Sequence, residues 1–234
     1  MKKALLILHQ KRSRPGDIGK KLIERGYILD IRRPCLGDRL PENLNEHSLV
    51  IIFGGPMSVN EPKCEFIQYE MNWLKVVIKS GKPFLGICLG AQMLAKYLGG
   101  NVKKTHCNSS EIGFFEILPS DSGLNIFNNQ KFFFQWHNEG FNLPQNSILL
   151  ASGRKFKVQA FKYKNCYAVQ FHPEVNFKMH LTWIYYVLTS DPKRLFVKGS
   201  QNLFFQLYLR IKYNGQISNW LDSFLDRYFL KNTI

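Results

Sequence analysis

The sequence lacks any apolar segment long enough to cross a membrane. Uninterrupted apolar stretches such as residues 49–53 are about five residues long, whereas a transmembrane helix needs about 20. The stretch at residues 4–8, which follows Met1 and two lysines, is also shorter than the roughly 7–15 apolar residues of a signal peptide. These absences predict a cytoplasmic protein without a membrane partner.

Cysteine is scarce, and no two cysteines are spaced as a pair. The five stand at positions 35, 64, 88, 107 and 166, with no CxxC motif among them. An odd number at wide spacing argues against a disulfide framework and for a reducing compartment. His106 and Cys107 are adjacent metal-binding side chains, but no second pair follows nearby, and a structural zinc site takes four ligands. We therefore expect neither a metal nor a cofactor.

Acidic residues are few, with 17 Asp and Glu against 32 Lys and Arg, so the formal net charge is +15. Such a field attracts nucleic acid and anionic membranes at low salt. The basic residues are scattered as pairs, however, without a dense block, a zinc finger or an aromatic RNA-binding motif. A solvated, lysine-rich surface is favoured over specific nucleic-acid binding, and a non-catalytic basic binding module is kept as a less favoured alternative.

Short apolar strands alternate with amphipathic helices through the first hundred residues. Fully apolar strands in such an alternation are typical of a parallel sheet covered by helices on both faces, and the length fits one main domain. The strands are expected at residues 3–8, 27–31, 49–53 and 83–87, and the helices at residues 16–25, 65–80 and 90–98.

The remaining chain changes character twice. Short aromatic or β-branched segments separated by Asn, Gly and Pro predict antiparallel strands added to the parallel core. These segments are residues 112–118, 132–136, 147–152, 158–163 and 166–171. After residue 176 the pattern is helical, so we expect an α/β domain at residues 1–176 and a helical extension at residues 177–234 packed on it.

Three polar residues are expected to begin helices in this extension. Asp191 precedes a proline, Ser200 precedes a helix, and Ser218 precedes another. The helix after Ser200 is expected to bury Leu203, Phe204, Leu207 and Ile211.

Residues 86–90 have the sequence GICLG, with an apolar strand before and a helix after. This is the cysteine form of the nucleophile elbow, a sharp strand-to-helix turn. Gly86 and Gly90 would relieve crowding around Cys88, and the positive end of the helix favours a thiolate. Cys88 is therefore the candidate nucleophile, although most free cysteines are inert core residues.

A thiol nucleophile needs a base and a group that orients the base. His172 and Glu174, which follow the strand segment at residues 166–171, supply both types of side chain. His172 can take and return the proton, and Glu174 can hold the other ring nitrogen. The tripeptide alone is a weak signal, and it becomes strong beside the elbow.

A glycine pair ends the third expected strand. Gly54 and Gly55 would leave bare backbone N–H groups facing the crevice in which parallel sheets bind ligands. The N–H groups of Gly55 and Leu89 are the candidate oxyanion donors, and Gly54 is a candidate substrate-binding residue. A tight strand-to-loop turn would explain the pair equally well.

Three segments together resemble class I glutamine amidotransferases, in particular stand-alone proteins related to the amidotransferase domain of GMP synthase. The segments are GGPMSVN at residues 54–60, GICLGAQ at residues 86–92 and QFHPEV at residues 170–175. The resemblance implies a flavodoxin-like fold and a Cys88–His172–Glu174 triad. It also implies attack on the side-chain amide of glutamine through a γ-glutamyl thioester, with release of ammonia and glutamate. Gln92 would help to bind the amino-acid end of the substrate.

The sequence departs from the resemblance at two places and leaves alternatives open. Asn138 and Glu139 stand where relatives have Gly-Asp, with Glu139 the candidate partner of the substrate ammonium, and Phe114 stands where they have Trp. No P-loop is present, so the ammonia would go to a separate synthetase subunit. Alternatively, the protein hydrolyses a γ-glutamyl amide without an acceptor. A chaperone or glyoxalase-type protein with a similar elbow is less favoured, because there a histidine usually follows the cysteine.

Overall fold

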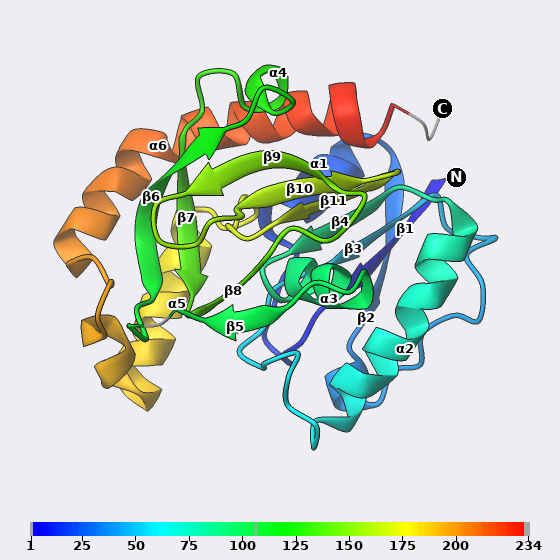
Figure 1. The fold of residues 1–234 in the computed structure, drawn as a ribbon, viewed down its shortest axis with the longest axis horizontal. Coiled ribbons are helices and arrows are strands. Elements are labelled where there is room, and N and C mark those ends of the chain that lie inside the picture. The colour runs from blue at the N-terminus through cyan, green and yellow to red at the C-terminus, as the bar shows by residue number, and fades with distance from the viewer. Residues whose placement is uncertain (1, 106, 232–234) are drawn as a thin grey trace.

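A nine-stranded sheet forms the centre of the computed structural model, which describes residues 2–105 and 107–231 (Figure 1). Its strands are β1 (Lys2–Ile7), β2 (Tyr27–Arg32), β3 (Leu49–Ile52), β4 (Phe84–Ile87), β6 (Glu111–Pro119), β7 (Phe132–His137), β9 (Ile148–Gly153), β10 (Ala160–Tyr163) and β11 (Cys166–Val169). Their order in the sheet is β2-β1-β3-β4-β11-β10-β9-β6-β7. Two further strands, β5 (Val102–Lys104) and β8 (Glu139–Phe141), form a separate antiparallel pair.

The first five strands in this order are parallel, and the others are antiparallel. The parallel core with added antiparallel strands confirms the expected α/β fold. The expectation for β11 was wrong in one respect, because β11 is antiparallel to β10 but parallel to β4. The hairpin turn from β10 returns the chain beside β4, so the carboxyl ends of β4 and β11 meet at one edge of the sheet.

Helices cover both faces of the sheet (Figure 1). They are α1 (Gly16–Glu24), α2 (Glu65–Ser80), α3 (Leu89–Tyr97), α4 (Leu124–Phe127), α5 (Phe177–Ser190) and α6 (Leu203–Phe224), with short 3-10 turns at Pro34–Leu36 and Pro192–Phe196 and a π-helical turn at Leu225–Phe229. Within the described residues, no helix is both long and apolar enough to cross a bilayer.

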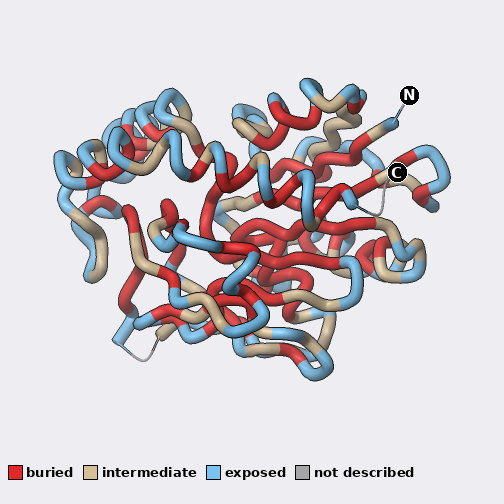
Figure 2. Tube along the Cα trace, turned by 90° about the horizontal axis from the view of Figure 1, so that it is seen from above, coloured by how far each residue is buried: buried red, intermediate tan, exposed pale blue. Residues whose placement is uncertain are grey.

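Two apolar cores result, one on each face. Successive side chains of a strand point to opposite faces, and those of β1 are apolar on both. Leu6 packs in the core that contains residues of α1 and α6, whereas Leu5 packs in the core that contains residues of α2 and α3. Figure 2 shows the buried segments running through the middle of the molecule, with exposed segments at its rim. Burial on both faces explains why these strands read as continuous apolar runs.

After residue 176, the helical segment expected after Asp191 begins there, whereas the helix starts expected after Ser200 and Ser218 do not agree with the structure. The side chain of Asn202 caps α6 by accepting from the Phe204 N–H, and α6 continues without a break through Ser218. The segment after Asp191 is a 3-10 turn with proline in its first turn, and the Asp191 side chain does not cap it. The division of the chain at residue 176 stays a prediction.

The buried face of α6 also differs from the expected one. Phe204 is 84% exposed and Ile211 is 71% exposed, whereas Gln206 and Arg210 are fully buried. The Arg210 guanidinium lies over the ring of Phe114, with its carbon 4.8 Å from the ring centroid. The buried face of α6 therefore includes two polar residues, Gln206 and Arg210, beside the apolar Leu209, and hydrophobicity alone does not indicate their burial.

Candidate active site

Cys88 lies in a sharp turn between β4 and α3. Its φ of 51° and ψ of −102° are uncommon for a residue with a side chain. A Cβ on Gly90 would clash with the Ile52 carbonyl oxygen, and one on Gly86 would lie 2.6 Å from the Gly90 carbonyl oxygen. Both flanking positions therefore require glycine, because strand and helix approach each other too closely for a side chain.

His172 lies beside Cys88, three residues after the end of the neighbouring parallel strand β11. Its Nδ1 is 2.9 Å from Oε1 of Glu174, and both side chains are buried. Burial lowers the pKa of His172, but the charge of Glu174 and the charge and hydrogen bond of Cys88 outweigh it and raise the pKa to about 10. The structure thus brings together the three residues that the sequence proposed as a triad.

Aromatic side chains hold the imidazole in place. The Trp183 ring packs edge-on against His172, with centroids 5.2 Å apart and an interplanar angle of 88°. The His172 backbone N–H donates to the Phe134 carbonyl oxygen. Trp183 comes from α5, and no local sequence pattern indicates its contact with the site.

The glycine pair after β3 lies against this cluster. A Cβ on Gly54 would lie 2.6 Å from His172 Cε1 and 3.4 Å from Cys88 Cβ. Within the described part of the chain, neither the Gly55 N–H nor the Leu89 N–H donates to a protein acceptor. Leu89 is the first residue of α3, where helical N–H groups have no partner in their own helix.

The side chain of Gln92 forms a hydrogen bond with the backbone of Glu139. The Gln92 Nε2 donates to the Glu139 carbonyl oxygen over 3.1 Å, and His137 Nδ1 donates to the same oxygen over 2.9 Å. Glu139 is half-buried, and Gln92 lies one turn after Cys88 in α3. Two of the three candidate substrate-binding residues, Gln92 and Glu139, are therefore neighbours at α3.

Other polar residues near the site belong to a buried network of hydrogen bonds. His137 Nε2 lies 3.1 Å from Gln135 Oε1 and 3.3 Å from Glu111 Oε2, and Gln159 Nε2 donates to that same carboxylate oxygen. Phe114 is also buried, against Phe134 in the core next to α6. A tryptophan at position 114 would therefore place its indole in this core, and the effect of Phe114 on the choice of substrate stays a prediction.

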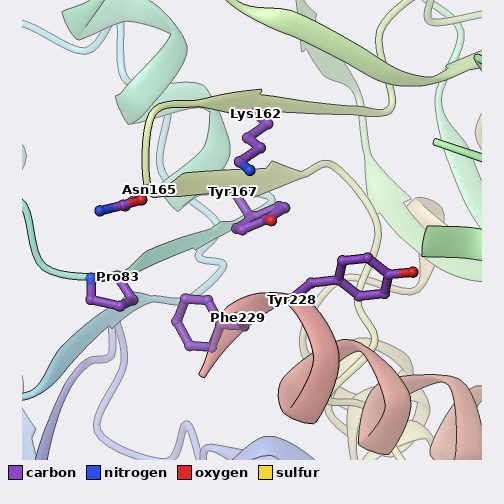
Figure 3. Close-up of a pocket in the computed structure, with 6 residues that line it drawn as sticks. All are labelled: Pro83, Lys162, Asn165, Tyr167, Tyr228 and Phe229. Carbon is purple, nitrogen blue, oxygen red and sulfur yellow. The ribbon is translucent and has the colours of Figure 1, made fainter. Parts of the chain in front are cut away.

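A shallow pocket elsewhere in the molecule contains none of these groups. Figure 3 shows Pro83, Lys162, Asn165, Tyr167, Tyr228 and Phe229 around it. Pro83 precedes β4, so the pocket lies at the amino end of that strand, whereas Cys88 follows its carboxyl end. The two places are separated by the length of the strand.

Among the residues that the structure describes, no group of three or more His, Cys, Asp or Glu side chains is placed to hold a metal ion. The pair noted at His106 and Cys107 lies partly outside the described residues, because His106 is not among them.

Comparison with known proteins extends the sequence resemblance. The family model "Glutamine amidotransferase class-I" matches residues 18–185. The glutamine amidotransferase-like protein YfeJ of Salmonella typhimurium is 28% identical over 180 residues, which cover 72% of this chain and 74% of YfeJ. One subunit of the glutamine-hydrolysing GMP synthase of Sulfurisphaera tokodaii is 34% identical over 139 residues, which cover 57% of this chain and 71% of that protein.

The fold is also found in solved structures. The crystal structure of a glutamine amidotransferase from Thermotoga maritima superposes with a TM-score of 0.87 at 28% identity, covering 97% of this chain and 98% of that one. The similarity thus includes the helices after residue 176 as well as the sheet.

Proposed function

The chain belongs to the family of class I glutamine amidotransferases, and on that premise we propose that it cleaves the side-chain amide of glutamine with Cys88 as nucleophile. The observation that carries the proposal is the placement of Cys88, His172 and Glu174 at adjacent carboxyl ends of β4 and β11. A buried thiol, a base and a carboxylate in this order are what acyl transfer through a thioester requires.

The proposed reaction proceeds in two halves. Glu174 holds Nδ1 of His172, and the raised pKa of His172 keeps the ring protonated, so Nε2 already carries a proton when the sulfur of Cys88 attacks the amide carbon. The tetrahedral intermediate collapses when His172 gives this proton to the leaving nitrogen, which releases ammonia and leaves a γ-glutamyl thioester. Water, deprotonated by His172, then attacks the thioester carbonyl, and glutamate leaves as the thiol is restored.

The glycine turn and the start of α3 are proposed to stabilise the oxyanion. The N–H groups of Gly55 and Leu89 lack protein acceptors in the described residues and flank Cys88. Donors held in place for a developing negative charge lower the barrier more than donors that must reorganise. Gln92, Glu139 and Gly54 are proposed to contact the substrate, with the Glu139 carboxylate near its ammonium group.

The fate of the ammonia separates two forms of the proposal. One relative is named as one subunit of GMP synthase, which supports transfer of the ammonia to a separate synthetase subunit. The second form, hydrolysis of a γ-glutamyl amide without an acceptor, is favoured by Glu139, whose side chain is one methylene longer than the aspartate of the resemblance. The cytoplasm as compartment stays a prediction.

Active-site labelling tests the proposal. A glutamine-like diazoketone should modify Cys88 alone, free glutamine should protect it, and Cys88→Ala should abolish ammonia release at a nearly unchanged melting temperature. Cys166 is the matched control, because it lies in the neighbouring strand β11 and burial raises the pKa of its thiol to about 12. Cys166→Ala should still be labelled and active.

Two results would refute this function. One is labelling spread over several cysteines, and the other is a Cys88→Ala protein that still releases ammonia. A panel of γ-glutamyl amides, assayed beside glutamine for ammonia or amine and glutamate, identifies which of the two forms is correct.

A further inference from the structure

A buried histidine lies directly behind the glycine turn. His9 follows β1, is fully buried, and has Nδ1 3.1 Å from the Gly54 carbonyl oxygen. Its Nε2 lies 3.0 Å from Oε2 of Glu70, which comes from α2 and is also fully buried. Nothing in the sequence joins these two residues, which are 61 positions apart.

The partners of His9 define its protonation. A carbonyl oxygen only accepts hydrogen bonds, so Nδ1 of His9 donates to Gly54, while the carboxyl group of Glu70 lies at Nε2. Burial lowers the pKa of His9, but the charge and hydrogen bond of Glu70 and the carbonyl groups of Gly54 and Phe53 outweigh it, and the pKa is raised. The turn therefore has a buried cation behind it.

Peptide geometry links this cation to the oxyanion site. In a trans peptide the C=O and the following N–H point in opposite directions. The hydrogen bond that holds the Gly54 oxygen toward His9 therefore directs the Gly55 N–H away from His9.

The surroundings of the turn show what lies on each side. A Cβ on Gly55 would lie 2.8 Å from His9 Cβ and 3.0 Å from Leu89 Cδ2, so Gly55 lies between the histidine and the start of α3. Gly54 lies against Cys88 and His172. The peptide that joins the two glycines thus separates His9 from the nucleophile.

We propose that His9, held by Glu70, is a positioning residue that orients the Gly54–Gly55 peptide so that its N–H faces the reacting carbonyl group. This inference rests on the proposed amide hydrolysis and adds a specific part to it. The imidazolium also polarises the peptide through the Gly54 oxygen, which strengthens the Gly55 N–H as a donor. Glu70 acts through His9, and neither residue touches the substrate.

A structural role for the pair predicts a different response to substitution. A buried ion pair contributes little net stability, and apolar residues of similar volume often replace it without loss. If the pair only filled space between β1 and α2, the contact with Gly54 would have no special importance for turnover, and the variant that preserves the contact with Glu70 would be the less perturbed one.

Two substitutions at one position separate these roles. In His9→Asn the amide nitrogen takes the place of Nδ1 and preserves donation to Gly54, while the contact with Glu70 is lost. In His9→Gln the amide nitrogen takes the place of Nε2, so the contact with Glu70 is preserved and donation to Gly54 is lost. The two variants have the same functional group and differ by one methylene.

Steady-state ammonia release from glutamine, or from the γ-glutamyl amide that the wild type cleaves best, gives the decisive readout. His9→Asn should keep kcat within about threefold, and His9→Gln should lower it about 10²-fold with a smaller change in KM, as for a lost oxyanion donor. Alkylation of Cys88 by iodoacetamide, which needs no oxyanion site, should proceed at the same rate in both. Equal kcat values, or a higher kcat in His9→Gln, would overturn the proposal.

Crystal structures of the variants decide the matter independently of turnover. The Gly54–Gly55 peptide should keep its orientation in His9→Asn and rotate in His9→Gln. If His9→Gln does not fold, the double variant His9→Leu/Glu70→Leu removes the donor without leaving a buried charge and should show the rotated peptide. An unrotated peptide there refutes the positioning role. A wild-type protein that cleaves no amide refutes the proposed function alone, because the crystallographic result still stands.

Discussion

At the scale of single residues, the site depends on close approaches that only glycine permits. Gly90 and Gly86 allow the elbow at Cys88, and Gly54 allows the strand end to lie against His172. The positive φ of Cys88 costs about 1–3 kcal/mol of backbone strain. The surrounding contacts hold the backbone in this conformation. Its backbone N–H donates to the Val169 carbonyl oxygen at the end of β11, which anchors the elbow to the strand before His172.

Removing the charge of Glu174 should slow turnover without unfolding the protein. In Glu174→Gln the imidazolium loses its ionised partner, and we expect kcat to fall about 10²-fold or more, because the carboxylate both orients the base and stabilises its charged form. The melting temperature should change little. Glu116→Gln, in a partly exposed ion pair with Arg154, is the control and should keep full activity. Unchanged turnover in Glu174→Gln would remove this carboxylate from the mechanism.

His180 should make the protein sensitive to acid. It is fully buried, donates from Nε2 to Gln206 Oε1 and accepts from Arg210 Nε at Nδ1, so it is neutral. Burial and the charge of Arg210 lower its pKa to about 3. The unfolded chain binds this proton near pH 6.5, so stability is complete above that pH and falls as the pH drops toward 3.

Urea unfolding as a function of pH measures this contribution. Between pH 6.5 and pH 4 the wild type should lose about 3 kcal/mol of unfolding free energy through His180, at about 1.4 kcal/mol for each pH unit. His180→Asn does not titrate, and its curve should be flatter by that amount whatever its absolute stability. Parallel curves for the two proteins would show that His180 protonates freely in the folded state.

At the scale of secondary-structure elements, α6 is attached to the sheet by a buried arginine. Besides the ring of Phe114, the guanidinium lies over Phe134, and Nη1 of Arg210 donates to the Val175 carbonyl oxygen over 2.6 Å. Val175 directly follows Glu174, so the same side chain joins the helix to the segment that carries the carboxylate of the candidate triad.

Truncating this arginine should destabilise the protein strongly. Arg210→Ala should lower the unfolding free energy by about 3–5 kcal/mol, because it leaves a large cavity and an unpaired buried carbonyl. Arg210→Met fills most of the volume and should recover part of the loss, leaving mainly the lost hydrogen bond and ring contacts. Urea unfolding at neutral pH compares the two, and equal stability of Arg210→Ala and the wild type would contradict this attachment.

At the scale of the whole molecule, the excess of basic residues is not concentrated in one segment of the sequence. The formal charge of +15 comes from residues spread over the chain. The absence of specific nucleic-acid binding stays a prediction.

Salt titration tests this prediction about charge. Binding to heparin and to oligonucleotides should be independent of sequence and should weaken about tenfold or more between low and physiological salt, because it depends on counterion release. Fluorescence anisotropy with several unrelated oligonucleotides measures both properties. Sequence-selective binding that persists at about 0.2 M salt would contradict the interpretation of a solvated surface.

The sequence by itself determined the parallel core and the positions of the candidate triad residues. Strands buried on both faces require apolar residues at every position, and a strand-to-helix elbow requires glycine on each side of the nucleophile. Residues 84–90 show the local part of this pattern, an apolar strand followed by a cysteine with a glycine on each side. The tripeptide with His172 and Glu174 could be recognised because it follows an apolar strand segment.

Only the tertiary structure decided the direction of β11 relative to β4, the buried face of α6, and the contacts of His9 and Trp183. Each depends on which surface lies opposite. β11 is parallel to β4 because its hairpin returns beside that strand, and α6 buries Arg210 because aromatic rings and the Val175 carbonyl face it. His9 and Glu70 meet only because β1 and α2 pack together across 61 residues of sequence. Such long-range partners stabilise charges that a local pattern places in solvent, so hydrophobic periodicity cannot indicate them.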